Sequence, residues 1–276
     1  MPERRRPRDP RERPSGQGRP EHGSRRSSGS RGDPGSSRRE PVRGGSPRGA
    51  RGGRSSKTEP THPPVHLADD VVRELHGTAR PGKAEILVKV FGEAAAAFAA
   101  EDFAEAVRLG EQSKHMALRS SVARELLGLA YYRLEKWKES ARELSAFRRL
   151  SGSTDQNPVI ADAYRAMGRP DKALELCDEM EAGSTPPAIF FEGTIVAAGA
   201  LADQKRLDDA IARLERLELN PEVAEEHHLR AWYTLADLLE RRGRFTHARD
   251  LFGAVAAADA DATDAPDRAA RLTGKG

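Results

Sequence analysis

The chain lacks paired cysteines and any long apolar run. Cys177 is the single cysteine among 276 residues, which excludes an intramolecular disulfide and a zinc site built from several cysteines. The most apolar stretch, 188–202, contains Glu192 and is shorter than the roughly 20 apolar residues that a membrane-spanning helix needs. No apolar segment follows the basic N-terminus as it would in a secretory signal. We therefore expect a soluble protein, and a cytoplasmic location fits best.

Residues 1–60 also lack large apolar side chains, because they contain no Leu, Ile, Phe, Tyr or Trp. They carry 17 Lys and Arg against 7 Asp and Glu, a net charge of +10, whereas the remaining 216 residues carry 29 against 36, a net charge of −7. Low hydrophobicity, high charge and abundant Gly, Pro and Ser predict disorder. We expect four segments: a disordered basic arm (1–65), a short helix and hinge (66–83), a helical repeat domain (84–259) and a flexible C-terminal tail (260–276).

The basic arm contains repeated Arg-Gly steps, which are typical of disordered segments that hold RNA. Arginine binds phosphates bidentately, and a mobile cationic segment gains affinity by releasing counterions. Against RNA binding, the arm has no aromatic side chain on which bases could stack. A solubilising tether stays open as an alternative, and so does an arm that folds back over the acidic remainder of the chain. The candidate nucleic-acid contacts are Arg43, Arg48, Arg51 and Arg54.

From Ala84 onward, apolar residues recur with helical spacing in paired segments that are separated by short polar turns. The clearest unit is 127–140, in which the turn falls at Glu135 and Lys136 and Trp137 opens the second helix. A small residue recurs in the second helix of each unit, at spacings of 34, 33, 37 and 38 residues. These small residues are Ala106, Ser140, Ala173, Ala210 and Ala248, and their counterparts in the first helices are Ala94, Gly128, Ala161, Ala198 and Ala236.

This pattern resembles the tetratricopeptide repeat (TPR), in which a small residue on each of two helices lets their backbones approach closely. The resemblance covers about two thirds of the chain and implies an all-α fold, a right-handed α-solenoid of about five TPR-like helix pairs. Segments such as 127–132 and 167–176 also look like those of TPR-like proteins from high-GC bacteria. The alternative fold is an irregular helical bundle, in which five units would have to match the repeat pattern by chance. Units one and four match the pattern least well.

In TPR proteins the first helix of each pair lines a concave groove in which partners bind, and the resemblance implies such a groove here. The groove would combine two tyrosines with charges of both signs, which suits an extended or helical peptide. Taken singly, each of these side chains could equally belong to a solvated helix face. The lysines and asparagines of a chaperone-tail carboxylate clamp are missing, since Phe91, Ala95 and Leu126 stand at three of their positions. The candidates are Glu125, Tyr132, Arg133, Asp162, Arg165, Asp203, Arg230, Tyr233, Asp237 and Arg241, with Asp155 and Glu192 at further groove positions.

Motifs that would carry chemistry are missing or incomplete. Residues 77–83 have the spacing of a phosphate-binding loop, but Ala84 stands where Ser or Thr should reach magnesium. No set of nucleophile, base and oxyanion donor emerges, and no histidine spacing suits a metal. We therefore predict a scaffold without enzymatic activity, cofactor or metal that binds a protein or peptide. An RNA- or ribosome-associated adaptor that uses the basic arm is the alternative.

Overall fold

The computed structural model describes residues 62–219, 224–261 and 263–274, and these residues form twelve α-helices and no strand. Arg43, Arg48, Arg51 and Arg54 lie outside the described residues. None of the helices in the described ranges is long and apolar enough to cross a membrane. The predicted all-α class is confirmed.

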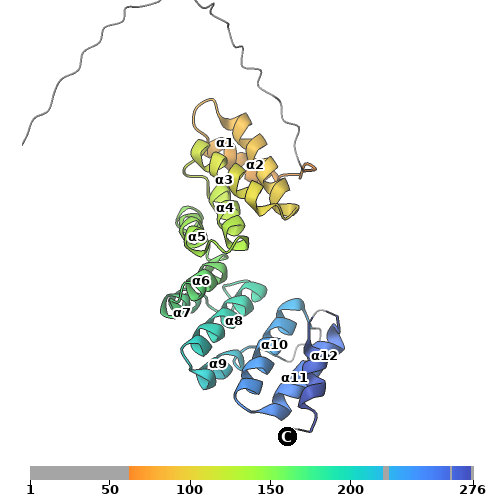
Figure 1. The fold of residues 1–276 in the computed structure, drawn as a ribbon. Coiled ribbons are helices and arrows are strands. Elements are labelled where there is room, and N and C mark those ends of the chain that lie inside the picture. Colours follow the sequence, from red (N-terminus) through yellow and green to blue (C-terminus); the bar gives the residue numbers. More distant parts are fainter. Residues whose placement is uncertain (1–61, 220–223, 262, 275–276) are drawn as a thin grey trace, which may run out of the picture. The chain divides into compact units, whose positions relative to one another are not determined.

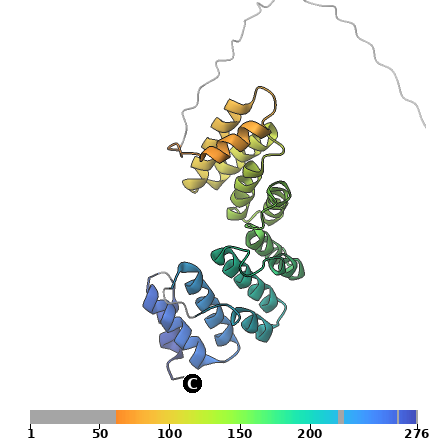
Figure 2. The same ribbon diagram turned by 180° about the vertical axis from the view of Figure 1, so that it is seen from behind.

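The helices follow one another in antiparallel pairs along the chain, as Figure 1 and the reverse view in Figure 2 show. Five pairs (α2 with α3, α4 with α5, α6 with α7, α8 with α9, α10 with α11) lie between the single helices α1 and α12. The bounds are α1 Asp69–Thr78, α2 Ala84–Ala99, α3 Phe103–Met116, α4 Ser121–Arg133, α5 Trp137–Ser151, α6 Asn157–Ala166, α7 Pro170–Asp178, α8 Pro187–Asp203, α9 Leu207–Leu214, α10 Glu226–Arg241, α11 Phe245–Ala258 and α12 Ala265–Leu272.

The same turn closes all five pairs. In each turn one residue has a left-handed backbone, with φ between 58° and 82°, and it lies five residues before the small residue of the second helix. The next residue donates a backbone hydrogen bond of 2.9 Å to the carbonyl five positions earlier, which is the bond of a Schellman motif. This shared geometry confirms the predicted register in all units, including the two weakest matches. The left-handed residues are Glu101, Glu135, Gly168, Lys205 and Gly243.

Small residues let the two helices of a pair approach closely. All five predicted small residues of the second helices are fully buried, at 0% exposure. In the second pair, a Cβ atom added to Gly128 of α4 would lie 2.6 Å from the side chain of Leu144 and 3.1 Å from its backbone nitrogen on α5. Since real Cβ atoms essentially never come that close, glycine is required there for the observed α4–α5 packing.

The C-terminal segment differs from expectation. Residues 260–276 were predicted to form a flexible tail, but α12 lies within them and packs against α11. Ala265 and Leu272 are buried, and Ala269 packs against the same hydrophobic core. These residues recur every three to four positions and so share one helical face. The prediction failed because eight residues give too short a pattern to stand out beside the acidic residues that precede them.

Candidate functional site

The first helices of successive pairs form one continuous side of the repeat stack. Helices α2, α4, α6, α8 and α10 contact one another in succession. We call this side the inner face. All ten predicted groove residues belong to α4, α6, α8 and α10 of this set.

In the middle of the inner face, four of the predicted residues are bonded to each other. The Tyr132 hydroxyl donates to Asp162 over 2.6 Å, and the Arg165 guanidinium donates to Asp162 over 2.8 Å and to Asp203 over 3.0 Å. Gly199 leaves room for this arrangement, since a Cβ atom there would lie 2.6 Å from the guanidinium carbon of Arg165. This chain of contacts, which we call the polar ladder, connects α4, α6 and α8.

The polar ladder also changes the ionisation of its tyrosine. Burial, together with the hydrogen bond to the Asp162 carboxylate, raises the pKa of Tyr132 well above its usual value. Tyr132 also packs edge-on against Trp137, with ring centroids 5.3 Å apart. The residue is thus a neutral, half-buried structural donor and not an exposed aromatic platform.

Three more predicted residues contact α12 or each other. The Tyr233 hydroxyl donates to Asp264 over 2.6 Å, and Arg268 donates to Asp237 over 2.8 Å. Arg241 lies 3.6 Å from Asp237 one helical turn away. Sequence reasoning missed Arg268 because it assigned this residue to a tail.

Two predicted residues lie apart from the others. Glu125 accepts a hydrogen bond of 2.8 Å from Gln156, and burial raises the pKa of its carboxyl. Arg133 lies over the ring of Phe103 in the preceding pair, 4.4 Å from its centroid. The structure therefore does not bring Arg133 together with its chain neighbour Tyr132.

Two adjoining hollows lie around α8 and α10, and the larger also reaches the end of α11 and the segment before α12. The larger, of about 580 Å³, has Ile195, Leu229 and Val255 among its apolar lining residues. The smaller, of about 390 Å³, reaches the start of α6. Both hollows are lined by Glu226 and Arg230, so they share an edge.

Carboxylates dominate the charge around these hollows. Arg230 is the single Lys or Arg among the described lining residues, and it forms an ion pair with Glu192 over 2.8 Å. Burial raises the pKa of Glu192, and Arg230 offsets part of that increase. The acidic lining residues are Asp155, Glu192, Glu225, Glu226 and Asp259.

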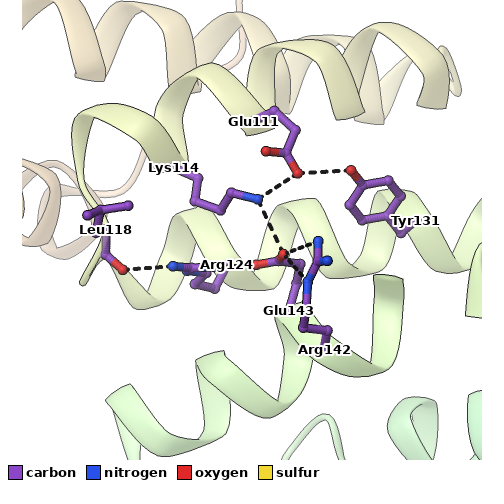
Figure 3. Close-up of polar contacts among 7 residues, drawn as sticks. All are labelled: Glu111, Lys114, Leu118, Arg124, Tyr131, Arg142 and Glu143. Atoms are coloured by element: carbon purple, nitrogen blue, oxygen red, sulfur yellow. Dashed lines mark hydrogen bonds and ion pairs between the residues drawn. The ribbon is translucent and has the colours of Figure 1, made fainter. Parts of the chain in front are cut away.

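A second polar cluster connects α3, α4 and α5, and its residues point toward one another in Figure 3. Its centre is Glu143, which is fully buried and accepts from Arg124 over 2.5 Å and from Lys114 over 3.3 Å. Lys114 also donates to Glu111 over 2.6 Å. Sequence reasoning missed Glu143, although it lies three positions after Ser140 and so on the buried face of α5.

Groups suited to metal binding or nucleophilic chemistry are scarce in the described segments. No three His, Cys, Asp or Glu side chains are placed there to hold a metal ion. Cys177 is 2% exposed, and burial raises its pKa to about 12. Since the thiolate is the reactive form of cysteine, this thiol is poorly suited to act as a nucleophile at neutral pH.

Three solved structures superpose on parts of this chain. A TPR protein of Thermus thermophilus, TTC0263, superposes with a TM-score of 0.50 at 17% identity, covering 68% of this chain and 98% of that protein. Yeast Tom70 gives a TM-score of 0.49 at 15% identity over 76% of this chain and 44% of its own. The NprR complex with its cognate peptide NprX gives 0.48 at 15% identity over 74% and 64%. Neither a family model nor a curated protein sequence matches the chain.

At these identities the likeness defines the fold alone. The helix pairs, their common turns and the Thermus thermophilus neighbour together define a TPR-like α-solenoid.

Proposed function

We propose that this protein is a non-enzymatic scaffold that binds a peptide or partner helix along its inner face. The observation that carries the proposal is the pair of adjoining hollows around α8 and α10. Binding sites are commonly concave and combine apolar surface with polar groups that fix the orientation of the ligand. Both hollows combine aliphatic and charged side chains.

We propose that the partner contacts the part of the predicted groove that lies at the hollows. Of the ten residues predicted from sequence, Arg230 and Tyr233 line the larger hollow. The polar ladder consists of four residues that are already bonded to each other, so a partner would have to break those bonds to use them: Tyr132, Asp162, Arg165 and Asp203. We therefore assign contact with the partner to the hollows and inter-repeat positioning to the ladder.

A pair of matched substitutions tests the proposal. Thr234 lines the larger hollow on α10, and Thr234→Trp should fill it. Thr246 is exposed on the second helix α11, and Thr246→Trp adds the same side chain away from the inner face. A partner captured by the wild-type chain should be retained by Thr246→Trp and lost by Thr234→Trp, provided that both variants keep the wild-type circular dichroism spectrum. Equal capture by both variants would contradict binding in the hollows.

A further inference from the structure

The linings of the two hollows indicate what kind of segment they could hold. The floor of the larger hollow is formed by Ile195, Leu229 and Val255, and the smaller has Val159 and Ile189 in its lining. Burying an apolar side chain there would remove apolar surface from water on both partners. A ligand that binds well should therefore carry at least one aliphatic or aromatic side chain.

The charged residues at the rim of the hollows also determine which ligand charge fits. Five carboxylates face one arginine there, and that arginine is already paired with Glu192. In the described part of the chain, Asp155 and Glu226 form no ion pair with any Lys or Arg. Glu225 has a structural task, because it caps α10 together with His228. Asp155 and Glu226 thus remain available for a cation on the ligand.

We propose that the hollows bind a basic segment of a partner protein, with an apolar side chain in the larger hollow and Lys or Arg side chains beside Asp155 and Glu226. This inference rests on the proposed function and specifies the chemistry of the partner. Opposite charge accelerates encounter and suppresses acidic competitors.

Two other occupants fit less well. The chain's own residues 1–60 have a net charge of +10 but no Leu, Ile, Phe, Tyr or Trp, so they would match the rim and leave the apolar floor unfilled. A second copy of the chain would bring another folded part from residues 61–276, whose net charge is −7. A basic segment of another protein that also carries an apolar side chain matches both the aliphatic lining and the carboxylates of the hollows.

Selection from a random peptide library displayed on phage tests the inference without a known partner. The purified full-length chain serves as bait, and enriched peptides are synthesised for fluorescence polarisation. Glu226→Arg reverses one rim charge, and Glu175→Arg makes the same change at an exposed position of the second helix α7. Enriched peptides should combine Lys or Arg with an aliphatic or aromatic residue. Their affinity should fall about tenfold in Glu226→Arg, stay unchanged in Glu175→Arg and weaken with added salt.

The possible failures can be told apart. Acidic or neutral peptides whose binding is lost in Thr234→Trp would overturn the basic partner but leave the proposed function standing. Selection that yields no peptide sensitive to Thr234→Trp would overturn both. A synthetic peptide of residues 1–60 that displaces the enriched peptides at lower concentration than they displace each other would assign the hollows to the chain's own arm, and would also overturn the inference.

Discussion

Replacing Glu143 with glutamine probes the buried charge cluster of Figure 3. The Glu143 side chain is 1% exposed and contacts Arg124 at 2.5 Å, Arg142 at 2.8 Å and Lys114 at 3.3 Å. Glutamine keeps the size of the side chain but removes the negative charge. The three cations lose their common counter-ion, and one of the two acceptor oxygens at the contact between the first and second helix pairs is replaced by an NH2 group that donates.

The expected loss of stability depends on which other partners, or how much solvent, each cation retains. Removing one partner of a buried ion pair typically costs about 3–5 kcal/mol, because the other charge is left uncompensated. Lys114 retains Glu111 at 2.6 Å, and Arg142 is 62% exposed, so water can solvate it. Arg124 is 19% exposed, and its Nε has no hydrogen-bond partner even in the wild type. We expect a loss of about 3 kcal/mol in the free energy of unfolding, mainly through Arg124.

The loss should depend on pH in a defined direction. Burial raises the pKa of Glu143, but hydrogen bonds from Arg124 and Arg142 outweigh it and leave the pKa below its usual value. A carboxyl with a lowered pKa contributes stability above its unfolded pKa of about 4.3 and loses it as the pH falls through the folded pKa. Wild type and Glu143→Gln should therefore differ fully at neutral pH and converge in acid.

Urea unfolding followed by circular dichroism measures the difference, with Glu175→Gln on the exposed face of α7 as the control. Because repeats contact mainly their neighbours, hydrogen exchange should show the loss of protection in α3, α4 and α5 before α10 and α11. The reasoning also predicts partial rescue: Arg124→Met combined with Glu143→Leu should be more stable than Glu143→Leu alone. A change below about 1 kcal/mol for Glu143→Gln, or additive effects in the double variant, would refute the cluster as a structural element.

Four further outcomes follow from the described geometry. Tyr132→Phe should lower stability by about 1–2 kcal/mol through the lost bond to a charged acceptor, and should leave the affinity of peptides bound in the hollows unchanged. Lys205→Gly should raise the free energy of unfolding by about 0.5–1 kcal/mol, since the residue has a φ of 67°; a decrease in urea melts would contradict the left-handed turn. Cys177 should react with Ellman's reagent at pH 8 only after denaturation, because burial raises its pKa to about 12. Burial and the neighbouring histidine lower the pKa of His228, so the unfolded chain takes up the proton first and stability should fall as the pH drops below about 6.5. Thermal melts of His228→Asn should lack that dependence.

The repeat register could be read from sequence because it depends on local constraints. A small residue at Ala173 or Ala248 is needed wherever two helices cross closely, and the same spacing recurs whatever the surface carries. The left-handed turn residue was less visible, since glycine occupies it at Gly168 but glutamate does so at Glu135. There the turn is set by the packing of the whole pair and not by the preference of one residue.

The functional assignments depended on contacts between units, which the sequence does not specify. A charged residue on a first helix has the same sequence pattern whether it meets solvent, a ligand or the next repeat. Asp203 bonds to Arg165 across 38 positions of chain, and no sequence motif at either residue indicates the pair. The glycine at position 199 is consistent with the Arg165–Asp203 contact, but a small residue there is equally typical of close helix packing.

These contacts also bear on where specificity can arise along the stack. Polar groups that are already satisfied within the fold offer a partner little, because binding must first break their existing bonds. On α4 and α6 the inner-face tyrosine and charges are paired in that way. On α10, Tyr233 is bonded to Asp264, and Arg230 forms an ion pair with Glu192. Among the hollow-lining residues, Asp155 and Glu226 differ, because neither forms an ion pair with a Lys or Arg of the described residues. Since these two carboxylates lie beside aliphatic side chains of the hollows, we infer that a partner's charge is recognised there, whereas the residues already bonded within the fold hold successive repeats in register.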